Sequence, residues 1–147
     1  MKYGSNGGDP IWTYEYHGNV SGGDDTPVGL AVDGDGNVYY GGTTTIASHG
    51  TDFIVERLDA GTGDVDWTYT YHSSGNANDD AADLAIGPGN VLAITGTSVG
   101  TSEDESDIVT VVLDPDDGSV IASEWPVIMG QENDETEIAR ARFRPCI

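Results

Sequence analysis

Basic residues are scarce in this chain of 147 residues, which has 26 acidic and only 5 basic side chains and a formal net charge of −21. Nucleic-acid binding needs clustered lysine and arginine, so this deficit argues against a nucleic-acid partner and, for the same reason, against an anionic membrane surface. Self-repulsion of this size opposes compactness at low ionic strength. It is typical either of adaptation to a saline medium, where salt screens the repulsion, or of a generally acidic surface.

Cysteine and long apolar runs are also scarce. The single cysteine, Cys146, excludes an internal disulfide. No stretch approaches the roughly 18 consecutive apolar residues that a transmembrane helix needs. Residues 1–10 (MKYGSNGGDP) are polar and glycine-rich and lack the apolar core of a signal peptide. We therefore expect a chain with no membrane span and no export signal.

What the sequence does contain is a repeat. WTYEYH begins at Trp12, and WTYTYH begins at Trp67, 55 residues later. Further matches follow in the same order at nearly the same spacing: Asp24-Asp25 with Asp79-Asp80, Leu30-Ala31-Val32 with Leu84-Ala85-Ile86, Gly42-Thr43 with Gly96-Thr97, and Leu58-Asp59 with Leu113-Asp114. Self-similarity at a fixed period is the signature of a repeat architecture.

Each copy divides into four short runs that are rich in branched and aromatic residues and bounded by Gly, Asp and Asn, the pattern of β-strands. The predicted strands are residues 28–32, 38–43, 53–58 and 65–71 in the first copy and residues 82–86, 91–96, 108–113 and 119–125 in the second. The third run of each copy is apolar on both faces, as expected of a strand buried on both sides. Four antiparallel strands per repeat, stacked face on face, predict an all-β fold of β-propeller blades.

The order of these runs predicts an incomplete propeller with two full blades and flanking strands. Its parts are a polar segment at 1–10, the last strand of a preceding blade at 11–17, blades at 25–71 and 80–125, and the first strand of a further blade with a basic tail at 133–147. Two blades do not close a ring, because propellers have about 4–8. We expect a piece of a longer propeller, or a unit that self-associates through its exposed blade faces. Joining the last strand of one copy to the first strand of another would leave that blade without its two middle strands.

The segment DDTPVGLAVDGDGNVYYGGTT, followed by TDFIVERLDAGTGDVDWTYTY, resembles the bacterial and archaeal β-propeller repeat proteins. Their repeats couple an A-V-D-x-x-G-N-V-Y hairpin to a D-x-x-x-x-x-L-D hairpin. The resemblance covers most of the chain from Trp12 to about Ile138. It implies a secreted or cell-surface protein and no single shared activity.

The stretch DAGTGDVDW, residues 59–67, is also similar to the tryptophan-docking motif of quinoprotein-like propellers, D-x-x-T-G-x-x-x-W. In that motif the indole packs between neighbouring blades while the Thr-Gly turn holds the hairpin. The resemblance implies structural roles for Asp59, Thr62, Gly63 and Trp67, and for their counterparts Trp12, Asp114 and Gly118. The second copy lacks the threonine and has Ala122 where tryptophan belongs, with Trp125 three residues later. No adjacent cysteine pair and no recognisable set of calcium and quinone ligands accompanies the motif, and a fold does not carry its function with it.

Asp33, Asp35 and Asn37 have the D-x-D-x-N spacing that begins a calcium loop. Thr44, however, stands where such a loop has a bidentate glutamate, and Val38 replaces the glycine at its sixth position. The segment coincides with a hairpin turn that recurs as GPGN at residues 87–90, so a turn is the preferred interpretation and a weak calcium site is the alternative.

The other polar and aromatic candidates also have structural interpretations. His17 and His72 are equivalent in the repeat, so a catalytic role would have to occur twice, and His49 has no nucleophile that we can assign to it. The alternating aromatic residues that begin at Trp12 and Trp67 share one strand face and would suit a sugar-binding strip, but packing between blades explains them more economically.

These observations predict a non-enzymatic repeat protein or interaction scaffold of surface type, with an unknown protein or glycan as its partner. We expect no catalytic residue and no cofactor, apart from the weak calcium site. Two alternatives stay open. One is a fragment of a quinoprotein-like (PQQ-type) enzyme, and the other is a calcium- or glycan-binding module.

Overall fold

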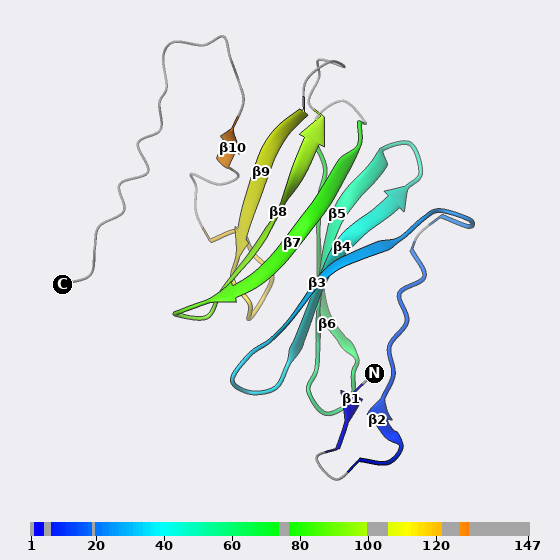
Figure 1. Cartoon of the computed structure of the whole chain (residues 1–147), viewed down its shortest axis with the longest axis vertical. Helices are drawn as coiled ribbons and strands as arrows, with labels where there is room; N and C mark the ends of the chain where they lie inside the picture. The colour runs from blue at the N-terminus through cyan, green and yellow to red at the C-terminus, as the bar shows by residue number, and fades with distance from the viewer. Residues whose placement is uncertain are drawn as a thin grey trace, which may run out of the picture.

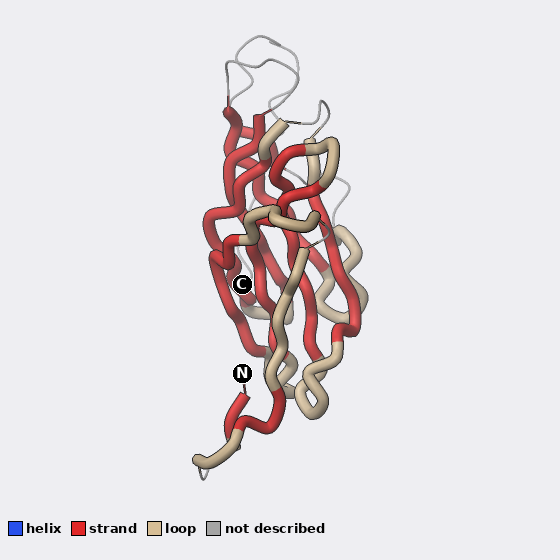
Figure 2. Tube along the Cα trace, turned by 90° about the vertical axis from the view of Figure 1, so that its right-hand side faces the viewer, coloured by secondary structure: helices blue, strands red, loops and turns tan. Residues whose placement is uncertain are grey.

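The computed structural model describes residues 2–4, 7–18, 20–73, 77–99, 106–121 and 127–129. Two four-stranded antiparallel sheets lie against each other, and a two-stranded sheet lies at one end of the molecule (Figure 1). Their strands run along the long axis (Figure 2). The predicted all-β fold of propeller-type blades is therefore confirmed. The described residues include no helix that is long and apolar enough to cross a membrane.

The two large sheets correspond to the two copies of the repeat. Blade 1 has the order β3 (Thr26–Val32), β4 (Val38–Ile46), β5 (Gly50–Leu58) and β6 (Val65–Tyr71). Blade 2 has the order β7 (Asp79–Gly87), β8 (Val91–Val99), β9 (Ser106–Leu113) and β10 (Val127–Met129). Strands adjacent in sequence pair with each other, which is the meander of a propeller blade. The small sheet pairs β1 (Lys2–Tyr3) with β2 (Pro10–Trp12).

The first strands of the two blades share an irregularity. The pairing of β3 with β4 shifts register between Pro27 and Gly29, and the pairing of β7 with β8 shifts between Ala81 and Asp83. Both bulges lie at the same point of the repeat. A bulge bends its strand, so both blades are curved in the same way.

The hydrophobic core lies between the blades. Its buried members are Tyr39, Phe53 and Val55 from blade 1 and Leu84, Leu92, Ile94, Val109, Val111 and Leu113 from blade 2. Strand β7 lies against β3, β4 and β5. One face of blade 1 is thus covered by blade 2, and its other face is the one that concerns the candidate site.

The fourth strand of blade 2 differs from the prediction of residues 119–125. Val120 forms only an isolated bridge with Leu113, and the next pairing joins Val127 to Thr110. In blade 1 the counterpart of Thr110 is Val55, which pairs with Tyr69. The repeat would therefore place the partner of Thr110 at position 124, three residues before Val127. The sequence explains the shift, because its tryptophan is displaced by the same three residues. Residues 122–126 lie outside the described part of the chain.

The predicted strand at 11–17 is also shorter than expected. Strand β2 ends at Trp12 and pairs with β1, which lies in the segment predicted only as polar. Residues 13–18 are in no strand and run beside blade 1 towards β3 (Figure 1). A strand needs a hydrogen-bonding neighbour, and among the described residues only Lys2 and Tyr3 supply one here. We call residues 12–18 the N-terminal strap. The strand and basic tail predicted at 133–147 lie outside the described residues.

Candidate functional site

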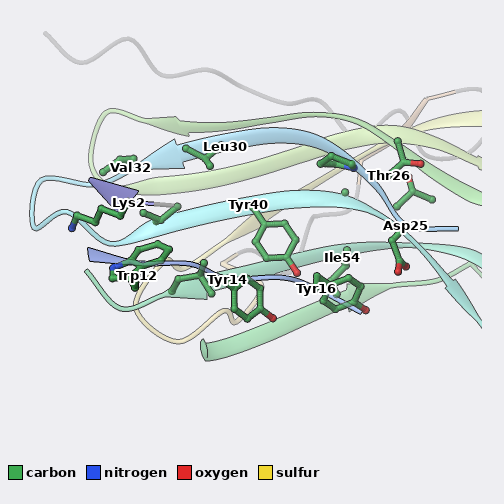
Figure 3. Close-up of a pocket in the computed structure, with 15 residues that line it drawn as sticks. Lys2, Trp12, Tyr14, Tyr16, Asp25, Thr26, Leu30, Val32, Tyr40 and Ile54 are labelled. Atoms are coloured by element: carbon green, nitrogen blue, oxygen red, sulfur yellow. The ribbon is translucent and has the colours of Figure 1, made fainter. Parts of the chain in front are cut away.

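The face of blade 1 that points away from blade 2 carries a groove of about 490 Å³. The strap forms one side of it, and β3 and β4 form the other. Figure 3 shows Trp12, Tyr14 and Tyr16 in a row along the strap, with Tyr40 beside them. The remaining lining residues are mainly apolar: Leu30, Val32, Val38, Ile54, Leu58, Pro27 and Gly42, with Lys2, Asp25, Thr26 and Thr43.

The same face of blade 2 is covered, which shows what the groove lacks. Leu30 pairs with Tyr40 across blade 1 as Leu84 pairs with Ile94 across blade 2, so Leu30 and Leu84 are equivalent. Leu30 is 68% exposed, whereas Leu84 is 6% exposed. Leu84 is buried because it lies against blade 1, close to Gly41. The groove is therefore a surface of the kind that blades use to stack.

Blade 1 is anchored to blade 2 by a tryptophan. The indole nitrogen Nε1 of Trp67 donates a hydrogen bond to the carbonyl of Pro115 over 3.0 Å. Its ring covers Gly118, where a Cβ would lie 2.7 Å from Cε3 of the indole. The φ angle of Gly118 is +73°, which glycine adopts readily and other residues do not.

The strap is anchored to blade 1 in the same way. Trp12 Nε1 donates to the carbonyl of Ala60 over 3.2 Å. The indole covers Gly63, where φ is +75° and a Cβ would lie 2.5 Å from Cδ2 of the ring. Each of these contacts lies 55 residues before its counterpart around Trp67. The strap thus occupies the position that the fourth strand of another blade would occupy.

The turn that holds Trp12 is fixed by Asp59. Its Oδ1 accepts hydrogen bonds from the backbone N–H groups of Gly61 and Thr62, each over 2.8 Å, and from the Thr62 hydroxyl over 3.1 Å. These bonds, with that from the Thr62 backbone N–H the strongest, hold the pKa of Asp59 below its ordinary value. In blade 2, Asp114 accepts from the backbone of Asp116, and both turns close with a backbone bond from the glycine to the aspartate. The structure therefore brings the motif residues together at each turn.

A buried carboxylate joins the strap to the open face. Glu56, 5% exposed, accepts from Tyr14 over 2.6 Å, from Tyr40 over 2.8 Å and from Thr68 over 3.0 Å. Burial, and then the bond to Glu56, raise the pKa of Tyr14 to about 12, and the same two causes raise the pKa of Tyr40. Sequence reasoning missed Glu56, which was treated as part of an apolar run. The signal was its counterpart Val111, a departure from the repeat.

The candidate calcium residues form a turn. Asp33 Oδ1 accepts from the backbone of Asp35 and of Asn37, and Oδ2 accepts from the Asn37 amide and the Tyr39 hydroxyl, each over 2.9 Å. Burial alone would raise the pKa of Asp33, but these hydrogen bonds outweigh it and hold the pKa below its ordinary value. Because both oxygens of Asp33 already accept two donors each, the geometry favours the turn interpretation, and the calcium site stays a prediction. The described residues contain no group of three or more His, Cys, Asp or Glu placed to hold a metal ion.

A second cluster, which the sequence did not predict, lies near one end of the blade interface. His49 Nδ1 lies 3.8 Å from Asp52 Oδ2, and the rings of His49 and His72 are 5.0 Å apart. Asp52 and Asp79 are almost fully buried, and each has one oxygen without a hydrogen-bond partner. Burial raises the pKa of Asp52, although the two histidines oppose the shift. Only the three-dimensional fold brings these residues together, because they come from different loops and strands.

The aromatic residues of β6 pack inside the molecule. The ring of Trp67 lies 6.0 Å from that of Tyr39, and the ring of Tyr71 lies 5.2 Å from that of Phe53. These rings contribute to the core between the blades. Their arrangement favours blade packing over a sugar-binding strip.

The comparisons with known proteins agree with this architecture. A family model described as a β-propeller repeat (SBBP) matches residues 16–48, which include the end of the strap, β3 and β4. A comparison with curated proteins finds no match. The chain therefore contains a β-propeller repeat.

Proposed function

We propose that the chain is a non-enzymatic interaction module, and that the open face of blade 1 docks another β-propeller blade. The difference in exposure between Leu30, at 68%, and Leu84, at 6%, carries this proposal. Both residues hold the same place in the repeat, and Leu84 owes its burial to a neighbouring blade. Full burial of a leucine or valine side chain contributes about 1.5–3 kcal/mol, so covering Leu30 and Val32 would favour docking.

The chemistry of the groove favours a protein over a glycan as the partner. The Tyr14 and Tyr40 hydroxyls are bound to Glu56, and the Tyr16 hydroxyl is bound to Thr44. An incoming partner meets apolar and aromatic surface with few free polar groups, whereas a glycan would need such groups for orientation. The described lining residues include no serine, cysteine or histidine, so the groove does not suggest nucleophilic catalysis.

The charge of the chain sets the conditions for docking. With a net charge of −21, two copies repel each other at low ionic strength. At about 1 M salt the Debye length falls to roughly 3 Å, and the repulsion is largely screened. We therefore place this function in a saline medium, and the resemblance to β-propeller repeat proteins supports a secreted or cell-surface location.

Light scattering on a sizing column, in low salt and in about 1 M salt, tests this proposal with the chain as its own probe. We expect association in high salt. Leu30→Asp should abolish it by placing a charge in the interface, whereas Ala47→Asp adds the same charge on an exposed turn and should leave it unchanged. A folded chain that stays monomeric in both buffers, or association that survives Leu30→Asp, would refute the docking function.

A further inference from the structure

We infer that the docking blade is blade 2 of a second copy of the chain, and that the copies share a strand, with the strap of one copy pairing with β9 of the other. This inference rests on the docking function proposed above. It adds the identity of the partner, the polarity of the contact and its register.

The strap is a fourth strand that lacks the other three. Its sequence, WTYEYH, matches WTYTYH, of which β6 forms the greater part. Strand β6 pairs with β5 through six residue pairs, whereas residues 13–18 of the strap are in no strand. Trp12 is nevertheless seated on blade 1 as Trp67 is seated on blade 2. The strap is therefore held in place with a strand edge to offer.

Blade 2 has the opposite deficiency. Strands β7, β8 and β9 are long, but β10 pairs with β9 through only three residues, 127–129. One further bridge joins Leu113 to Val120. Ala122 stands at the position where the repeat calls for tryptophan. A strap from a second copy would replace three residue pairs with as many as β6 makes, and it would bring its own tryptophan.

The repeat fixes the register of the shared sheet. In blade 1, Ile54 pairs with Thr70 and Val55 with Tyr69. Shifting each position by 55 residues pairs Val109 of one copy with Glu15 of the other, and Thr110 with Tyr14. The strands would be antiparallel, as β5 and β6 are.

The side chains between the stacked blades also match. Phe53 of blade 1 lies against Gly96 of blade 2, where a Cβ would be 2.7 Å from the ring. The counterpart of Phe53 is Ile108, which is 56% exposed on blade 2. The counterpart of Gly96 is Gly42, which lines the groove. Ile108 of one copy would lie over Gly42 of the next and lose its exposure.

Each copy then offers one surface on blade 1 and a different one on blade 2, so the contact is head-to-tail. Such contacts form rings when the rotation closes. With two blades per copy, the number of blades in a ring is even. Since propellers have about 4–8 blades, the expected assembly contains two, three or four copies.

A disulfide between copies tests the register. In a Cys146→Ser background, one sample carries Glu15→Cys and a second carries Val109→Cys. Within one chain blade 1 separates these positions, so only a contact between copies can join them. In about 1 M salt with mild oxidant, mixing should give a disulfide-linked pair of chains. We expect roughly tenfold less linkage when Asp83→Cys, exposed elsewhere on blade 2, replaces Val109→Cys, because cysteines with Cα atoms more than ~7 Å apart do not bridge without backbone movement.

A second pair, Tyr16→Cys with Ile108→Cys, covers the case in which the buried valine variant fails to fold, since Ile108 is exposed. Near-UV circular dichroism of each variant establishes folding. If the chain associates through Leu30 but neither pair forms a disulfide, the strand exchange is wrong and the docking function stands. If the chain stays monomeric, both are wrong.

Discussion

Replacing Gly63 by alanine should destabilise the chain far more than the same change at Gly89. Both glycines have positive φ angles, +75° and +83°. A Cβ on Gly63 would lie 2.5 Å from Cδ2 and 2.7 Å from Cε3 of Trp12, whereas nothing lies within 4 Å of a Cβ on Gly89. The two variants therefore share the backbone strain, and only one of them displaces the indole.

The magnitudes follow from these contacts. The left-handed conformation costs a non-glycine residue about 1–2 kcal/mol, and this applies at both sites. At Gly63 the indole must also move, which breaks the Trp12 hydrogen bond to Ala60 and loses about 0.5–1.5 kcal/mol. Partial exposure of the ring adds a further 1 kcal/mol or so. We expect a loss of about 1–2 kcal/mol for Gly89→Ala and about 3–4 kcal/mol for Gly63→Ala.

Urea unfolding followed by tryptophan fluorescence measures the difference. Equal m-values for the variants and the parent chain would establish that the midpoints report stability. Gly118→Ala should behave like Gly63→Ala, because a Cβ there meets the ring of Trp67 at 2.7 Å. If Gly63→Ala and Gly89→Ala lose the same free energy of unfolding within about 0.5 kcal/mol, the packing of Trp12 on Gly63 contributes nothing to stability and our account of the strap is wrong.

Three further predictions concern the polar groups. Burial raises the pKa of Asp52, so its contribution to stability is present below the ordinary aspartate pKa of about 3.9 and is lost as pH rises through the raised value; Asp52→Asn should increase the free energy of unfolding at pH 7 and change it little at pH 3, and an equal effect at both would contradict this. The pKa of Tyr14 is raised to about 12, so the contribution of its neutral hydroxyl is complete below about pH 10 and lost towards pH 12; Tyr14→Phe should lower stability at neutral pH by about 1.5–3 kcal/mol through its bond to Glu56, with phenolate absorbance as the probe of ionisation. Asp33→Ala should cost about 2–4 kcal/mol in thermal unfolding, because it strands several buried donors, whereas Asp35→Ala, on an exposed side chain, should stay within about 0.5 kcal/mol.

The repeat made most of the fold predictable. Strand β6 has the predicted bounds, residues 65–71, because Gly63 marks the turn before it and alternating aromatic residues mark its buried face. Three of the seven other blade strands, β4, β5 and β9, begin or end at a predicted residue, since Gly, Asn and Asp punctuate the chain on local grounds.

Features that depend on distant partners were not predictable from local patterns. The strap has the sequence of a strand, yet only Trp12 belongs to one, because strand structure requires a hydrogen-bonded neighbour. Glu56 looks like a solvent-facing residue until the structure places three hydroxyl groups around it. The contact of His49 with His72 depends on how two loops meet at the blade interface.

The tryptophan anchors also set where the chain can be divided. Each indole belongs by sequence to one sheet and by contact to the next, since Trp12 is held at Gly63 and Trp67 at Gly118. The cooperative segments therefore run from a tryptophan to the following glycine turn, residues 12–63 and 67–118, and are out of step with the sheets. A truncation after Tyr71 keeps a whole sheet but deprives Trp67 of its seat. The unit that duplication or recombination could pass on intact is this offset segment, because it carries both halves of its own anchor.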